Sequence, residues 1–250
     1  MQHVRWLVAI ILIISNLAAI PAAFSSIPDV NVMPNATGDE VATLYELIDV
    51  GEFERPDFEI FNYAMIGFDR IKKEKKLANE NIITLIDFRK PSTEKRLWVI
   101  DLKNKKVVMQ SLVAHGRNSG ELYARAFSNK MNSHQSSLGF YATGATYTGK
   151  HGLSLKLHGL ENNINDQSEP RAIVVHGADY VSDAYAKKYG RIGRSFGCPA
   201  LPLDNYKDLI KRIAGGSCLF IYYPDKAYFK NTQLITNHGD LHTFAQSTEP

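Results

Sequence analysis

Two short stretches of the chain hold residue types that can do nucleophilic chemistry. Residues 174–177 read Val-Val-His-Gly, so that His176 ends an apolar run and precedes a glycine. Residues 191–199 form a second stretch, with two glycines, two arginines and Cys198. A thiol is a weak nucleophile near neutral pH because little of it is thiolate, and an imidazole beside it can take its proton. The residue types therefore predict a cysteine nucleophile, Cys198, with His176 as its general base.

The loop around Cys198 has further features that suit this chemistry. Gly197 allows the backbone to turn sharply, so that consecutive N–H groups can point at a developing oxyanion. Arg191 and Arg194 are cations that could lower the pKa of the thiol. Pro199 fixes the chain just after the nucleophile. We therefore expect this loop to hold both the nucleophile and its oxyanion donors.

A structural reading of the same residues stays open at this point. A single cysteine is more often a small buried hydrophobe than a catalyst, and a histidine at a strand end is often structural. Cys218 fits that description because it lies in the apolar run Ser217–Ile221. In an exported protein, Cys198 and Cys218 could instead form one disulfide.

The elements that must position these residues follow from periodicity. Apolar residues at helical spacing predict helices over residues 39–50 and 57–77, and a third helix over 203–213 is followed by two glycines. Alternating or β-branched runs predict the strands, at residues 82–86, 97–102, 107–114, 138–143, 153–157, 171–175 and 218–222. The expected fold is mainly β, with a helix near its end and two preceding N-terminal helices.

The N-terminus and the bulk composition bear on where the protein acts. A short cationic start, an apolar run at Trp6–Ile14 and small residues after it are typical of a secretory signal peptide, or of an uncleaved anchor. We therefore expect export to the periplasm or cell envelope. The net charge of +3 is too small and too dispersed to predict a nucleic-acid partner. We also expect no stable membrane partner beyond that possible anchor.

The expected organisation has five parts. In order along the chain they are a signal peptide, a linker, an N-terminal helical segment, a catalytic domain and a polar tail, over residues 1–25, 26–38, 39–80, 81–226 and 227–250.

The motif His-Gly, an interval, then Ser-x-Gly-Cys resembles the signature of the L,D-transpeptidase (YkuD-like) family, and the chain is most similar to a divergent branch of murein L,D-transpeptidase catalytic domains. The stretches that carry the resemblance lie in order between residues 81 and 222, at Leu85–Phe88, Arg96–Asp101, Val113–Asn118, Phe127–Asn129, Ser136–Gly139, Ile173–Tyr180 and Gly193–Pro199. The resemblance implies a β-sandwich catalytic domain. It also implies a cysteine acyl-transferase of peptidoglycan stem peptides that needs no cofactor and no metal.

The resemblance also assigns roles to single residues. Cys198 would attack an L,D peptide bond and form a thioester, and His176 would act as base and then as acid. The backbone carbonyl of Gly177 would orient the histidine. The oxyanion would be held by N–H groups of Phe196, Gly197 and Cys198, and Ser195 is the signature serine.

One departure from the family pattern concerns the substrate anchor. The usual arginine two residues after the cysteine is Ala200 here. Arg194, Arg191 and Arg117 are the cations that could replace it. The remaining candidates for the substrate-binding wall are His115, His158 and Tyr180. His115, His151 and His158 each precede a glycine, but their scatter over the chain does not predict a metal site.

Three functions fit this reading. The first is a transpeptidase that transfers the acyl group to an amine of a second stem. The second is an L,D-carboxypeptidase or endopeptidase that uses water as the acceptor. The third is a non-catalytic protein that binds the cell wall, which the intact pair of His176 and Cys198 disfavours.

Overall fold

A computed structural model describes residues 38–235 of the chain. The expected signal peptide, almost all of the linker and the end of the polar tail lie outside these residues. The helices are α1 (Gly38–Leu47), α2 (Phe58–Lys73), α3 (Asp183–Tyr189), α4 (Tyr206–Ile213) and α5 (Lys226–Asn231). The strands are β1 (Ile82–Asp87), β2 (Leu97–Asp101), β3 (Lys106–Ser111), β4 (Gly139–Gly149), β5 (Gly152–Gly159), β6 (Val174–Gly177), β7 (Ala200–Leu201) and β8 (Cys218–Tyr222).

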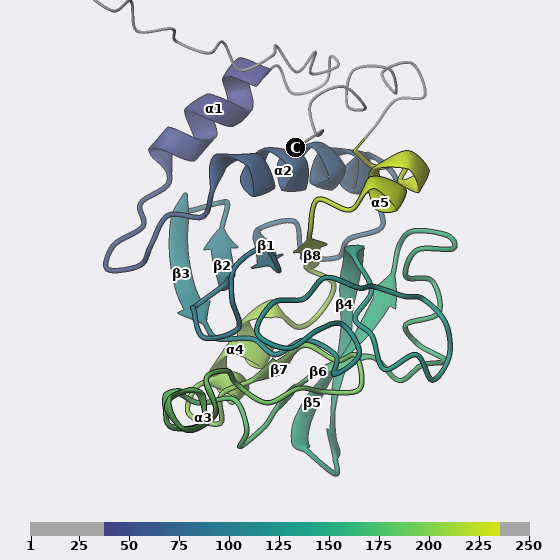
Figure 1. The fold of residues 1–250 in the computed structure, drawn as a ribbon. Coiled ribbons are helices and arrows are strands. Elements are labelled where there is room, and N and C mark those ends of the chain that lie inside the picture. Colours follow the sequence, from purple (N-terminus) through teal and green to yellow (C-terminus); the bar gives the residue numbers. More distant parts are fainter. Residues whose placement is uncertain (1–37, 236–250) are drawn as a thin grey trace, which may run out of the picture. The chain divides into compact units, whose positions relative to one another are not determined.

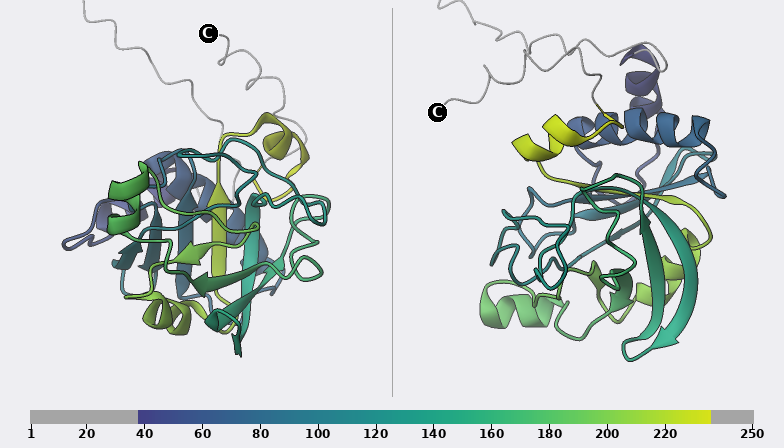
Figure 2. Two further views of the ribbon diagram at one scale, coloured as in Figure 1. Left: turned by 60° about the horizontal axis from the view of Figure 1, so that its bottom comes forward. Right: turned by 90° about the vertical axis from the view of Figure 1, so that its right-hand side faces the viewer.

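The strands form one mixed sheet of eight strands in the order β3-β2-β1-β8-β4-β5-β6-β7. The β1·β8 and β6·β7 pairs are parallel, and the other neighbours are antiparallel. The register of β4 against β5 shifts between Thr143 and Thr146, where an irregularity bends a long strand. The sheet curves back as a nearly closed, barrel-like sandwich (Figures 1 and 2).

The helix α2 packs on the sheet through one apolar face. Asp57 caps its start by accepting the N–H of Glu59, and cations occupy its last turn. The buried residues of α2 contact β1 and β8, and Figure 1 shows the helix above these strands with α4 on the other side. Gly67 is needed where α2 passes Phe140 of β4, because a Cβ there would lie 2.1 Å from the Phe140 ring. α2 is therefore part of the same hydrophobic core as the sheet.

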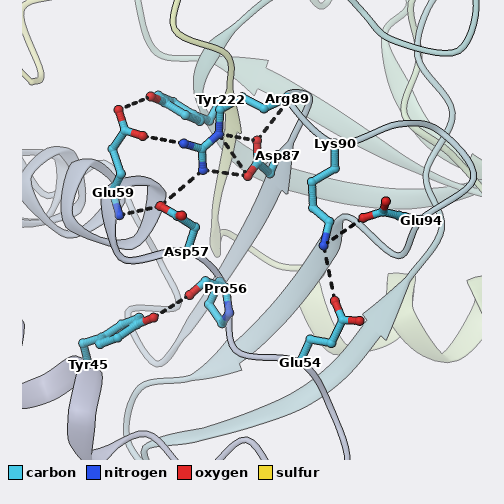
Figure 3. A network of polar contacts seen from close by, with 10 residues as sticks. All are labelled: Tyr45, Glu54, Pro56, Asp57, Glu59, Asp87, Arg89, Lys90, Glu94 and Tyr222. Atoms are coloured by element: carbon cyan, nitrogen blue, oxygen red, sulfur yellow. Dashed lines mark hydrogen bonds and ion pairs between the residues drawn. The ribbon is translucent and has the colours of Figure 1, made fainter. Parts of the chain in front are cut away.

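A network of ion pairs fastens the start of α2 to the ends of β1 and β8 (Figure 3). Arg89 contacts Asp87 at 2.8 Å and Asp57 at 3.3 Å, and it also pairs with Glu59. The Tyr222 hydroxyl donates to Glu59 at 2.8 Å. Because Asp87 is buried and both of its oxygens accept from Arg89, the network is structural and is satisfied within the protein.

The structure confirms the expected fold class, with two helices before a mainly β domain and α4 near its end. Several elements differ from the predicted pattern: α3 and β7 were not predicted, and β4 runs to Gly149 instead of ending at residue 143. The β-branched run at 171–175 predicts a strand, but Ala172 has φ +54 and the strand begins at Val174. The segment expected to be a polar tail begins with α5, whose Tyr228 is 4% exposed. None of the helices within residues 38–235 has the length and apolarity needed to cross a bilayer.

Glu161, in the turn after β5, is a buried carboxylate with no ion-pair partner among the described residues. It accepts the Phe140 N–H at 2.7 Å and the Tyr228 hydroxyl at 3.3 Å, and it also accepts the Thr232 hydroxyl. Burial is the main cause that raises the pKa of Glu161 to about 6. The carboxylate therefore joins α5 to β4, but its ionisation in this dry site is unfavourable.

We expect Glu161 to make the free energy of unfolding fall as the pH rises from 4.5 to about 6. In this window the unfolded chain loses the proton while the folded protein keeps it. Protonation therefore stabilises the folded state below pH 4.5, and this stabilisation is lost as the pH rises to about 6. The change is about 2 kcal/mol, because a tenfold change in proton affinity is worth about 1.4 kcal/mol. The free energy of unfolding, measured with urea at several pH values in this range, should depend less on pH in Glu161→Gln, which cannot ionise. An identical dependence on pH in the two proteins would contradict the assignment.

Candidate active site

Adjacent strands bring the predicted nucleophile and base together. His176 in β6 pairs with Ala200 in β7, and its N–H donates to the Pro199 carbonyl at 3.4 Å. The Cys198 Sγ accepts the N–H of Val174, two residues before His176, at 3.5 Å. The loop that carries Cys198 therefore runs next to β6, with its thiol at the Val174 backbone and Ala200, two residues later, opposite His176.

The His176 ring is held by the carbonyl of the next residue. Its Nδ1 lies 2.9 Å from the Gly177 carbonyl oxygen, which can only accept, so Nδ1 carries the proton and Nε2 has its lone pair available. His176 is 3% exposed, and burial is the main cause that lowers its pKa. Gly177 must be a glycine, since a Cβ there would lie 2.8 Å from the Tyr206 ring. The arrangement favours a neutral imidazole that is ready to accept a proton.

Ser195 organises the turn that presents Cys198. Its hydroxyl donates to the Cys198 carbonyl at 2.6 Å and accepts the Gly197 N–H at 3.0 Å. Gly197 has φ +125, and a Cβ there would lie 2.8 Å from the Gln135 carbonyl oxygen. The Gly197 N–H, expected to be an oxyanion donor, is thus already engaged by Ser195. The N–H groups of Cys198 and exposed Phe196 remain as the loop's candidate donors.

The cations that act on Cys198 are not the two arginines of its own loop. Burial raises the pKa of the Cys198 thiol, while Arg171 and Lys150 favour its thiolate. The Arg171 guanidinium donates to the carbonyls of Ser128 and Gln135 and to two serine hydroxyls, at 2.6–3.2 Å. Sequence reasoning missed Arg171 and Lys150 as site residues, although Arg171 stands just before the strand that carries His176.

The three candidate substrate arginines differ in how far they are already paired. Arg191 and Arg194 both bind the Glu121 carboxylate, at 2.8 and 2.5 Å, and Arg194 also donates to two backbone carbonyls. Arg117 is exposed, has no ion pair among the described residues, and lies 5.0 Å from the centre of the Phe196 ring. Ala200 is fully buried in a small apolar cluster, so no long side chain fits there. Arg117 is therefore the candidate with its charge available.

His115, which was expected to line the substrate-binding wall, lies in the protein interior instead. It is fully buried, its Nδ1 accepts from the Arg96 guanidinium at 2.9 Å, and its Nε2 donates to the Gly120 carbonyl at 3.2 Å. Burial first, and then the nearby Arg96, lower the pKa of His115 to about 3. Both ring nitrogens are used inside the protein, so His115 supports the segment beside the cysteine loop and cannot contact a substrate.

His158 and Tyr180 lie in different surroundings. His158, on β5, is partly exposed and lies 3.4 Å from Glu169. Tyr180 packs against Gly193 of the cysteine loop, where a Cβ would lie 2.5 Å from its side chain. Burial is the main cause that raises the pKa of Tyr180 to about 12, and Cys198 adds to that effect. Tyr180 is therefore beside the nucleophile. Within residues 38–235 no three His, Cys, Asp or Glu side chains are arranged to hold a metal.

Comparison with known proteins places this site in a family. The model of the L,D-transpeptidase catalytic domain matches residues 53–222, well over half of the chain. No curated protein matches the chain.

Solved structures that resemble the chain do so at low identity. An L,D-transpeptidase from Mycobacterium smegmatis is 12% identical over 57% of this chain and 59% of its own, with a TM-score of 0.36. A helical cell shape determining protein from Campylobacter jejuni is 15% identical over 58% of this chain and 48% of its own, with a TM-score of 0.37. The chain thus spans about half to three fifths of these structures. From the sequence match over residues 53–222, the chain belongs to the L,D-transpeptidase catalytic domain family.

Proposed function

We propose that the protein is a cysteine acyl-transferase that cleaves an L,D peptide bond in peptidoglycan stem peptides and passes the acyl group to an amine. The observation that carries the proposal is the His176 ring. Its Nδ1 is committed to the Gly177 carbonyl, so its Nε2 is available on the strand beside Cys198. Membership of the family supports the same chemistry.

The proposed reaction has two halves. In the first, His176 Nε2 takes the thiol proton, and Cys198 Sγ attacks the carbonyl carbon at the L-centre of a diamino acid. The C–N bond breaks, His176 returns the proton to the leaving amine of the D-residue, and a thioester remains. In the second, an acceptor amine attacks the thioester and gives its proton to His176. The C–S bond then breaks, and the Cys198 thiolate recovers the proton.

The electrostatics of the site favour a general-base mechanism. Burial raises the pKa of Cys198 and lowers the pKa of His176, so both changes oppose a preformed thiolate–imidazolium pair. The resting pair is then a neutral thiol and a neutral imidazole. Proton transfer accompanies attack on the substrate, and the negative charge moves to the oxyanion, where the Cys198 and Phe196 N–H groups are the candidate donors.

The surface beside the loop supports a peptide substrate with a carboxylate. We propose that Arg117 supplies the positive charge that Ala200 lacks, because Arg191 and Arg194 are already paired with Glu121. The Phe196 ring, 61% exposed, stacks on His134 with ring centres 4.5 Å apart. It would provide an apolar platform between Arg117 and the nucleophile. Since peptidoglycan lies outside the cytoplasm, the proposal includes export to the periplasm or cell envelope.

Product analysis tests the proposed function. Purified protein incubated with tetrapeptide stems should give crosslinked dimers with loss of the terminal D-residue, measured by mass spectrometry. Tripeptide stems without dimers would identify water as the acceptor and make the protein an L,D-carboxypeptidase. Unchanged stems, with intact protein, would leave only wall binding and would overturn the proposal.

A further inference from the structure

The tip of the β4–β5 hairpin reaches the candidate base. Gly149 pairs with Gly152 as the last pair of this ladder, so Lys150 and His151 form the turn, and Gly152 closes it at φ +74. The His151 ring stacks on the His176 ring, with centres 4.4 Å apart and planes 23° apart. His151 is exposed whereas His176 is buried, so His151 forms the outer cover of the base.

Three connections fix the hairpin tip relative to His176. Ser154 stands opposite His176 in the β5·β6 ladder, and its hydroxyl donates to the Gly152 carbonyl at 3.2 Å. The side chain of Tyr206, from α4, lies beneath both glycines. A Cβ at Gly152 would lie 2.9 Å from its hydroxyl, and one at Gly177 would lie 2.8 Å from its ring. Gly152, which follows the covering residue His151, and Gly177, whose carbonyl binds Nδ1, thus contact the same side chain.

The stack supplies a constraint that the Gly177 carbonyl alone does not. One hydrogen bond at Nδ1 anchors one edge of an imidazole but leaves the ring able to tilt about that edge. A flat ring against its face limits the tilt and so fixes the direction of Nε2. We propose that His151 is a positioning residue, which holds the His176 ring by stacking so that Nε2 points at the Cys198 thiol. This inference rests on the proposed function of Cys198 and His176.

The charges around His176 indicate that His151 acts by stacking and not by its charge. The titratable groups that act on the ring are Lys150 and His151 from the hairpin. Positive charge on Lys150 or His151 disfavours the imidazolium form of His176. A protonated His151 would therefore oppose the step in which His176 accepts a proton. An uncharged flat ring at position 151 should serve as well as histidine.

The test compares two substitutions of His151 by the rate at which iodoacetamide alkylates Cys198, from pH 6 to 9. We expect His151→Phe, which keeps the stack, to remain within about twofold of the unmodified protein across this range. We expect His151→Ala, which removes it, to be slowed about tenfold with an unchanged melting temperature. Thr148→Ala, at an exposed position of the same hairpin, is the matched control and should have no effect. His176→Ala sets the rate without the base.

Each outcome decides one claim. If His151→Ala reacts as fast as the unmodified protein while His176→Ala is slow, the positioning role is wrong and the base assignment stands. If His151→Phe is as slow as His151→Ala, the proton of His151 is needed and stacking is not its role. If His176→Ala is itself unimpaired, the proposed base is wrong. In that case, the NMR resonances of the His176 ring in His151→Ala would still show whether loss of the His151 ring changes the position of the His176 ring.

Discussion

Replacement of Cys198 by alanine should abolish the conversion of stem peptides, with a loss of more than about 10³-fold. The thiol is the atom that forms the proposed thioester, and no other side chain among the described residues replaces it in the loop. The fold should be retained, because the polar contacts of the Cys198 Sγ among the described residues are long, at 3.5 and 3.6 Å, to the Val174 N–H and the Ala172 carbonyl. Turnover by mass spectrometry and the melting temperature measure the two effects separately.

Cys218 provides the matched control for this prediction. Both thiols are free, which excludes the disulfide that the sequence left open. Cys218 is fully buried in β8, and burial raises its pKa far above the ordinary range. Cys218→Ala should keep turnover and lose about 1 kcal/mol of stability.

Alkylation separates the two thiols without a substrate. Cys198 is half-buried and should react first, with a rate that increases above neutral pH because its own pKa is raised. Cys218 should react only in denaturant. Equal labelling of both thiols in the folded protein, or full turnover by Cys198→Ala, would remove Cys198 as the nucleophile.

The two segments that the structure sets side by side, β6 and the loop of Cys198, could be recognised in the sequence because their signals are local. A β-branched strand that ends in His-Gly, and a glycine-bearing loop with one cysteine, are each readable within ten residues. The exact start of β6 could not be read in this way. Ile173 belongs to the same β-branched run, but its N–H donates to the Ser168 carbonyl at 2.8 Å and so stays in the preceding turn. This hydrogen bond replaces the one that Ile173 would make in the sheet, and it cannot be predicted from the pattern of apolar residues.

The surroundings of the site depended on pairings between distant segments. Arg191 and Arg194 looked available in the sequence because Glu121, about 70 residues earlier, gave no sign that it neutralises both. His151 was visible as one of several His-Gly dipeptides, but its stack on His176 follows from the register of β5 against β6. Residue type and spacing therefore pointed to the proposed reacting groups, whereas the contacts of the residues around them follow from the register of the sheet.

Arg96, just before β2, is a buried residue that supports the segment beside the Cys198 loop. Its side chain is fully buried, and it has no ion pair among the described residues. Its guanidinium donates to the Val113 carbonyl at 2.9 and 3.2 Å, to the Lys90 carbonyl at 2.8 Å and to His115 Nδ1 at 2.9 Å. Burial lowers the pKa of Arg96 to about 9, so it remains charged at neutral pH. One cation thus satisfies two buried acceptors on the segment that runs beside the Cys198 loop, and joins them to the Lys90 carbonyl in the turn after β1.

Replacement of Arg96 by methionine should lower the free energy of unfolding by about 3 kcal/mol or more, because those acceptors lose their donor in a dry interior. Lys95→Met is the matched control, since the neighbouring side chain is exposed, and it should change stability by less than about 0.5 kcal/mol. Urea unfolding measures both.

If Arg96→Met does not fold, Arg96→Lys can be measured in its place. It keeps the charge but cannot reach all three acceptors, so its loss of stability should be intermediate. The pKa of His115 should rise in Arg96→Met, because loss of the nearby positive charge removes one cause that lowers it. Equal stability of the variants at positions 95 and 96 would show that the buried guanidinium does not hold this segment.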